Sequence, residues 1–123
     1  MNFEIIKADY TNARHCIHIP LLLDEYARDP MGGGKPLDRM VKASLVSELA
    51  KRPYAFSVIA YADNQPSGLV NCFEAFSTFA GKPLVSIHDF VVAKEFRGNN
   101  ISQLILQKVD QIAREKDCCI FTL

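Results

Sequence analysis

The sequence lacks a long apolar run and an excess of charge of either sign. Its longest uninterrupted apolar runs are far too short to cross a bilayer. Fourteen Lys and Arg residues balance fourteen Asp and Glu residues, and basic residues occur at most two in succession. Binding to nucleic acid usually depends on a basic cluster or stripe. We therefore expect neither a membrane protein nor a nucleic-acid partner.

The N-terminus also lacks a secretory signal, because no basic segment there precedes an apolar one. It opens with strand-like residues that include Glu4, and we expect a cytoplasmic protein. The cysteines are even in number but irregularly spaced, and free cysteine behaves as a small buried hydrophobe. We expect reduced core thiols at all four cysteine positions, which are Cys16, Cys72, Cys118 and Cys119.

Metal ligands are few as well. His15 and His18 flank Cys16 in a predicted helix, and a histidine pair at this spacing can share a metal ion. Tetrahedral zinc normally takes three or four protein ligands, and no third spaced ligand accompanies the pair. The sequence therefore predicts no metal site.

What the chain does have is ordinary globular composition. Its 123 residues are 49% hydrophobic and 23% charged, which fits one domain spanning residues 1–123. Apolar periodicity and turn residues predict the elements. Strands are expected at residues 3–8, 54–62, 68–76, 84–92 and 118–123, and helices at residues 13–28, 38–51 and 101–116. The order β-α-α-β-β-β-α-β predicts an α+β fold in three layers with a mixed, mainly antiparallel sheet.

Several local signals refine the first half of the chain. Thr11 or Asn12, and later Asp38, are suited to cap helices. Pro20 predicts a kink in the first helix or a boundary between two short helices. The buried face of this helix is expected to include Ile17, Leu21 and Tyr26. Residues 29–36 hold three glycines between two prolines, so we expect no regular element there, but a flexible linker or a mobile lip over a cleft.

Residues 87–112 combine strand and helix signals around a glycine. Apolar and β-branched residues up to Val92 precede Arg97 and Gly98, and apolar residues then recur at helical spacing from Ile101. A strand that enters a helix through such a turn leaves the first helical N–H groups unpaired, and the helix dipole favours negative charge there. This arrangement is typical of a phosphate site.

The segment R-G-N-N-I-S at residues 97–102 resembles the signature of the GNAT acyltransferases, in which Arg or Gln-x-x-Gly-x-Gly or Ala opens the third helix. The resemblance implies that acetyl-coenzyme A (acetyl-CoA) is the cosubstrate. Its pyrophosphate would lie on the loop and its pantetheine arm on the preceding strand. The implied cofactor-binding residues are Val91, Val92, Arg97, Gly98, Asn99, Asn100, Ile101 and Ser102. Asn100 stands at a glycine position, and asparagine tolerates left-handed backbone better than most residues.

The strings D-P-M-G-G-G, F-S-T-F and I-H-D-F-V-V further resemble an uncharacterised bacterial subgroup of this family. In the family, the first two helices and their connection commonly contribute to the acceptor site. The resemblance therefore implies substrate contacts at Met31, Gly32 and Gly33, and Glu74 is a further candidate.

The resemblance stops at Leu123, where the family normally continues into another helix and a final hairpin. It implies a C-terminally truncated GNAT-like fold. A terminal apolar strand with an open edge invites pairing with another chain. We expect a homo-oligomer, specifically a dimer, formed through residues 118–123.

Acetyl transfer to an amine needs a route for the proton of the nucleophile. Strict alternation along the fourth strand would place Ser86, His88, Phe90 and Val92 on one face and Ile87, Asp89 and Val91 on the other. Some family members carry a glutamate base at the position of Ser86, but serine is a poor base. His88, whose reference pKa is about 6.5, and Asp89 are the candidate catalytic residues, and Glu74 or an ordered water chain remains an alternative route for the proton. A structural role is the alternative for His88.

Two functions follow from the resemblance. The leading one is an N-acetyltransferase that moves an acetyl group from acetyl-CoA to an amine of a small molecule or peptide by direct attack. The alternative is a catalytically inactive GNAT-like module that binds CoA, or a partner chain through its open strand edge. An unrelated phosphate-binding domain is less favoured, because the order of elements matches the family.

Overall fold

The computed structural model describes residues 1–122, with side chains to residue 119. Its strands are β1 (Phe3–Lys7), β2 (Ala55–Ala62), β3 (Gln65–Ser77), β4 (Lys82–Val92) and β5 (Cys119–Thr122). Its α-helices are α1 (Ala13–Arg28), α2 (Arg39–Ala50) and α3 (Ile101–Glu115), and the short 3-10 helices are η1 (Pro30–Gly32) and η2 (Lys94–Phe96). The predicted order of strands and α-helices is confirmed. Leu123, the last residue of the predicted final strand, lies outside the described residues.

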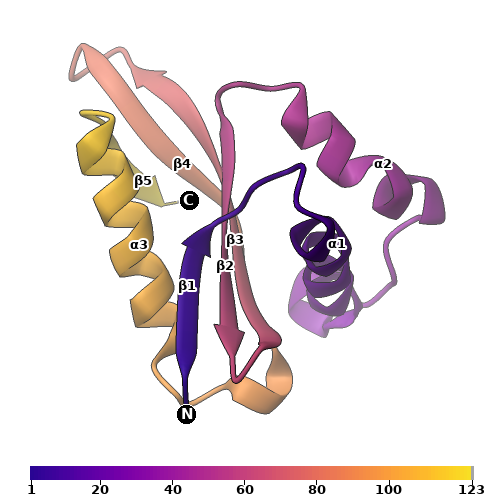
Figure 1. Cartoon of the computed structure of the whole chain (residues 1–123). Coiled ribbons are helices and arrows are strands. Elements are labelled where there is room, and N and C mark those ends of the chain that lie inside the picture. The colour runs from indigo at the N-terminus through magenta and orange to yellow at the C-terminus, as the bar shows by residue number, and fades with distance from the viewer. Residues whose placement is uncertain (123) are drawn as a thin grey trace.

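The strands form one sheet in the order β1-β2-β3-β4-β5. The first four pair antiparallel, and β5 runs parallel to β4 after the chain has crossed over through α3. The helix α3 covers one face of the sheet, while α1 and α2 cover the other (Figure 1). The predicted three-layer α+β fold is confirmed.

Helix starts and one hairpin follow from local chemistry. The side chain of Asn12 accepts the N–H of His15 at 3.1 Å, and Asp38 accepts the N–H of Met40 at 2.8 Å, so both predicted caps are present. The β2–β3 turn is made by Asp63 and Asn64, whose φ angles of 48° and 68° suit the twist of a tight hairpin.

The helix α1 differs from its prediction in two ways. Pro20 lies inside one continuous 16-residue helix and does not divide it. Ile17 and Leu21 are 65% and 55% exposed, so their predicted burial is wrong. The helix carries apolar residues on two sides, and the side that packs on the sheet includes Ile19 and Leu22. Apolar spacing alone could not decide which of the two stripes would meet the sheet.

A buried core lies on each face of the sheet. The α3-side core joins β2, β3 and β4 to the apolar stripe of α3, and the other core joins the sheet to α1 and α2. Gly68 of β3 fixes how closely α3 approaches, because an added Cβ would lie 2.7 Å from Cδ1 of Ile105. This close packing holds the start of α3 beside the end of β4.

A β-bulge interrupts β4 at His88. Asp89 pairs with Asn71 and Ile87 pairs with Cys72, so His88 has no partner on β3. The extra residue reverses the alternation of side chains along the strand. Val85 and Ile87 before the bulge therefore pack in the same α3-side core as Phe90 and Val92 after it. The predicted division of β4 into two faces is wrong for this reason.

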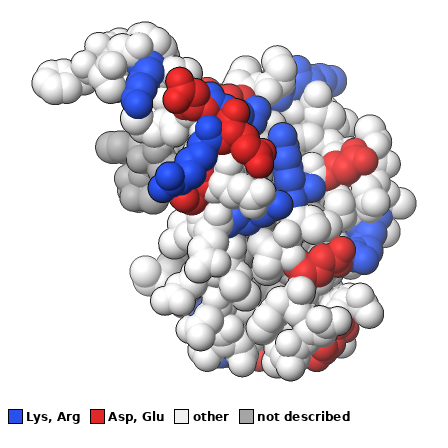
Figure 2. Space-filling model, turned by 60° about the vertical axis from the view of Figure 1, so that its left-hand side comes forward, with Lys and Arg blue, Asp and Glu red and all other residues white. Residues whose placement is uncertain are grey.

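Charged side chains of both signs are interspersed on the side of the molecule that Figure 2 shows, and they do not separate into large patches of one sign. Among the described residues, none of the helices has the length and apolar character that crossing a membrane would need.

Candidate active site

Two hollows lie side by side near the carboxyl end of β4. The larger, of about 540 Å³, is lined by the end of α1, by η1 and by Phe90, Val91 and Val92. The smaller, of about 330 Å³, is lined by the loop before α3 and the first residues of that helix. Val92 and Arg97 line both, so the two hollows adjoin. Each predicted cofactor residue except Asn99 lines one of the hollows. Of the predicted substrate residues in the glycine-rich segment, Met31 lines the larger hollow, whereas Gly32 and Gly33 line neither.

The loop that opens α3 enters the helix through a left-handed residue. Asn100 precedes the helix in the left-handed region, with φ 61°, which explains how asparagine can stand at a glycine position of the motif. Its side chain makes no capping hydrogen bond, and the first turn of α3 contains no acidic residue. The positive end of the helix dipole is therefore not neutralised by a local side chain.

Gly98 and Asn99 shape the same loop. Gly98 has φ 90°, and an added Cβ would meet no atom within 4 Å. Glycine is required there for the backbone conformation and not for lack of space. The side-chain amide of Asn99 donates to the carbonyl of Phe96 at 3.0 Å, which ties the loop back to η2.

Arg97 is bound by the end of β4 and by the segment after α1. Its Nε donates to the carbonyl of Val92 at 3.3 Å, and its Nη2 lies 3.5 Å from the carboxylate of Asp29. Asp29 also accepts the N–H of Met31 at 2.9 Å and thereby caps η1. The pKa of Asp29 is lowered, chiefly by that backbone hydrogen bond and further by Arg97. This ion pair joins the segment after α1 to the loop before α3.

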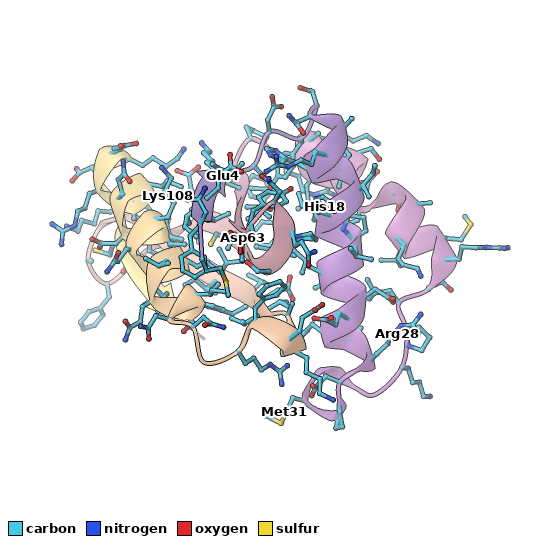
Figure 3. All side chains as sticks on the ribbon, turned by 60° about the horizontal axis from the view of Figure 1, so that its bottom comes forward. Glu4, His18, Arg28, Met31, Asp63 and Lys108 are labelled. Atoms are coloured by element: carbon cyan, nitrogen blue, oxygen red, sulfur yellow. The ribbon has the colours of Figure 1, made fainter. Side chains whose placement is uncertain are left out.

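The glycine-rich segment is more regular than the sequence indicates. Residues 30–32 form η1, so the prediction of no regular element is wrong there. A Cβ on Gly32 would overlap the carbonyl of Tyr26, and Gly33 has φ 113°, so the backbone needs glycine at both positions. Met31 is 86% exposed and points away from the body of the molecule (Figure 3). The segment forms one wall of the larger hollow.

Glu74 is not part of this arrangement. It pairs with Val85 across β3 and β4, far along the strands from the Gly68–Val92 pair beside the hollows. Its carboxylate lies 3.5 Å from Nζ of Lys116 after α3. The structure does not bring it together with Met31, Gly32 and Gly33.

The bulge separates the two candidate catalytic side chains. His88 is exposed and lies edge-on to Phe73, with ring centroids 4.7 Å apart. Asp89 is half-buried, and its Oδ2 accepts the side-chain amide of Asn71 at 3.1 Å. Asp89 immediately precedes Phe90, which lines the larger hollow.

Asn71 belongs to a chain of hydrogen bonds that sequence reasoning missed. Its Oδ1 accepts the hydroxyl of Ser57 at 2.6 Å, and the hydroxyl of Tyr10 lies 2.8 Å from that of Ser57. Ser57 and Asn71 are buried polar residues in otherwise apolar strands. A buried polar residue needs a partner, so the polar letters within these apolar runs were a usable signal.

Cys72, His15 and His18 lie outside the two hollows, where one is buried and the others form hydrogen bonds. Burial raises the pKa of Cys72 to about 12, and the charge of Asp89 adds to this effect, so its thiol is a poor nucleophile. His15 accepts the N–H of Asp9 at 3.0 Å, and Nδ1 of His18 lies 2.9 Å from the hydroxyl of Tyr61. Within residues 1–122, no group of three or more His, Cys, Asp or Glu side chains is arranged to hold a metal ion.

Similar folds are found among solved structures. An aminoglycoside acetyltransferase from an uncultured soil metagenomic sample has a TM-score of 0.75 at 16% identity, covering 100% of this chain and 80% of its own. The ribosomal-protein-alanine N-acetyltransferase of Brucella melitensis biovar Abortus 2308 has a TM-score of 0.78 at 15% identity, covering 99% and 79%. AAC(6')-Iy, solved with the bisubstrate analogue CoA-S-monomethyl-acetylneamine, has a TM-score of 0.79 at 16% identity, covering 100% and 80%. At these identities the likeness concerns the fold alone.

No curated protein sequence matches the chain. The family model described as "Acetyltransferase (GNAT) family" matches residues 20–123. Because this match covers most of the chain, the protein belongs to the acetyltransferase (GNAT) family of acyl-CoA N-acyltransferases.

Proposed function

We propose that this protein transfers the acetyl group of acetyl-CoA to an amine of a small molecule or peptide, by direct attack of the amine on the thioester. The main support for the proposal is that the two hollows adjoin at Val92 and Arg97. Together they run from the start of α3 along the end of β4. A ligand with a diphosphate at one end and a thioester on a long arm matches this shape.

The residues around the smaller hollow fit the diphosphate of acetyl-CoA. Gly98 leaves open space above the loop, and the first turn of α3 has no acidic side chain that would repel an anion. Asn100 and Ser102 line this hollow, and both carry groups able to donate to phosphate. The loop amides of residues 98–102 would hold the diphosphate, as at other helix N-termini.

The larger hollow fits the pantetheine arm and the acetyl group. Its wall of Phe90, Val91 and Val92 is the end of β4, and Tyr26 and Met31 add apolar surface opposite. In the part of the chain that the structure describes, β5 pairs with β4 only along Leu84–Ile87. Beyond the bulge, the backbone of β4 on that side is therefore available to the amides of the arm.

In the reaction, acetyl-CoA supplies the thioester, and the neutral amine supplies an electron pair for the new C–N bond. The C–S bond breaks, CoA leaves as a thiolate, and the amine nitrogen loses one proton. We assign Asp89 to accept that proton, directly or through one water, because its carboxylate is fixed by Asn71 just before the residues that line the larger hollow. His88, exposed at the bulge, is the second candidate.

The charges around the larger hollow are mixed and do not select the acceptor. Glu25 and Asp29 line it together with Arg28, Lys94 and Arg97. AAC(6')-Iy, which shares the fold, was solved with an acetylneamine unit joined to CoA. Aminoglycosides are therefore the first acceptors to test, followed by peptide amines.

The test has two stages. Calorimetric titration of acetyl-CoA should give saturable one-to-one binding, and a dephospho analogue of the coenzyme should show how much the phosphates contribute. Release of CoA thiol is then measured with a panel of amines. Turnover supports the enzyme, binding without turnover supports the inactive CoA-binding module, and no binding at millimolar acetyl-CoA contradicts both.

A further inference from the structure

A line of hydrogen bonds crosses the sheet beneath α1 and α2 and ends at Asp89. It begins at Tyr10, between β1 and α1, and passes through Ser57 of β2 and Asn71 of β3. Ser57 is fully buried, and Asn71 is 2% exposed. Polar groups at such depth are costly unless each is paired, so the arrangement of donors and acceptors along this line is constrained.

The chemistry of the four groups fixes the direction of every bond. The amide Oδ1 of Asn71 carries no hydrogen, so the 2.6 Å contact uses the single hydroxyl hydrogen of Ser57. The hydroxyl of Tyr10 must then donate to Ser57, at 2.8 Å. Nδ2 of Asn71 is left to donate to Asp89, and an ionised carboxylate can only accept. A flipped Asn71 amide would turn its oxygen toward the carboxylate and lose the bond to Asp89, so the carboxylate sets the orientation of the amide. Ser57, held by Tyr10, then binds the amide oxygen.

The hydrogen bond between Asn71 and Asp89 lies beside the bulge in β4. Asn71 and Asp89 are cross-strand partners at the flank of the bulge, where an extra residue redirects the following side chains. Asn71 holds Oδ2 of Asp89, while Oδ1 accepts no hydrogen bond from any side chain or backbone group of residues 1–119. One oxygen is thus fixed by Asn71, and the other has no hydrogen-bond partner among the described residues.

We propose that Asn71 is a positioning residue for acetyl transfer, which holds the carboxylate of Asp89 toward the amine, and that Ser57 and Tyr10 anchor the oxygen of the Asn71 amide. The proposal rests on the proposed function. A carboxamide does not relay protons, so the line acts as a brace and not as a proton wire. Asn71 acts only through Asp89 and touches no reacting atom.

The deciding experiment is a double-mutant cycle between Asn71→Leu and Asp89→Asn. Turnover is followed by thiol release, with acetyl-CoA and the amine that the acceptor screen finds most active. Asn71→Leu should lower kcat about tenfold or more while the calorimetric Kd for acetyl-CoA stays unchanged, because only the base is misplaced. In the Asp89→Asn background the same change should have no further effect on kcat.

Ser57→Ala provides a milder variant, because it removes one hydroxyl and leaves Asn71 in place. It should lower kcat by a smaller factor, about threefold, again with no loss in the Asp89→Asn background. If Asn71→Leu does not fold, Ser57→Ala alone tests whether the Asn71 amide positions Asp89. Tyr10→Phe should act in the same direction as Ser57→Ala, since both release the Asn71 amide.

Three results would overturn the proposal. Equal losses of kcat with and without the Asp89 carboxylate would show that Asn71 acts through the fold, and so would a loss of acetyl-CoA affinity that parallels the loss of kcat. Full activity of both Asn71→Leu and Ser57→Ala would remove the brace from the mechanism. A wild-type chain that turns over no amine would instead overturn the proposed function, and this inference with it.

Discussion

The carboxylate of Asp29 lies 3.5 Å from Nη2 of Arg97, so the acidic end of the segment after α1 holds the arginine of the loop that opens α3. The two residues also line the larger hollow together. An anionic ligand at the start of α3 would compete with Asp29 for this arginine. The ion pair therefore couples the wall predicted to meet the acceptor with the loop predicted to bind the cosubstrate.

Asp29→Asn should tighten the binding of acetyl-CoA by about two- to fivefold, because the Asp29 carboxylate no longer competes with the ligand for Arg97. Asparagine can still accept the N–H of Met31 and cap η1, so the segment should keep its shape. Calorimetry at low and high salt measures the effect, which should shrink as salt rises. Glu48→Gln on α2 removes a carboxylate paired with Lys51 away from both hollows and serves as the control. Unchanged or weaker binding in Asp29→Asn would contradict the coupling.

Gly98→Ala tests the loop itself. Alanine at φ 90° costs about 1 kcal/mol or more in backbone strain, and the loop can relieve it only by leaving the observed conformation. Gly81, in the β3–β4 turn with φ 68° and nothing within 4 Å of an added Cβ, is a matched control. Both variants should lose similar amounts of stability in urea unfolding. Only Gly98→Ala should weaken the binding of acetyl-CoA, and equal affinity in the two variants would count against the proposed diphosphate site.

Asp89→Asn and His88→Ala separate the two candidate bases. A general base contributes about 100-fold or more to the rate, so Asp89→Asn should lose at least that factor in kcat. His88→Ala should stay within about threefold of the wild type, since the exposed ring contacts Phe73 and that contact affects stability more than chemistry. Thiol-release kinetics at saturating acetyl-CoA provide the measurement. The reverse ranking would assign the role of base to His88.

Features determined by a few neighbouring residues could be predicted from the sequence. The caps at Asn12 and Asp38, the bounds of α1 and the parallel return of β5 follow from local residue chemistry and connection rules. The loop before α3 was predictable for the same reason, because its glycine and the following helix are adjacent in the chain.

The parts that failed depend on contacts between distant segments. The bulge at His88 arises from pairing between β3 and β4, and strict alternation along one strand cannot indicate it. The exposure of Ile17 is decided by which stripe of α1 meets the sheet. The bond between Asn71 and Asp89 joins residues 18 positions apart and depends on the register that the bulge creates. The sequence therefore indicated which residues could form the site, but their positions relative to one another could be obtained only from the structure.

The stability of the protein should decline as the pH falls below about 6.5, because burial lowers the pKa of His18 and the positive charge of Arg14 lowers it further. The unfolded chain, with an ordinary histidine pKa, then takes up a proton before the folded chain does. The contribution of His18 is fully present above pH 6.5 and is lost as the pH falls through its folded pKa. Urea midpoints at pH 7.5 and 5.5 measure the change.

The variant that tests this prediction is His18→Gln. Glutamine at position 18 cannot be protonated, so this variant should lose less stability between pH 7.5 and 5.5 than the wild type, even if it is less stable at both. The carboxylates with lowered pKa values, Asp9, Asp24, Asp29 and Glu48, lose their contributions only at more acidic pH, so they do not obscure this window. The same loss in wild type and His18→Gln would show that another group controls the acid sensitivity.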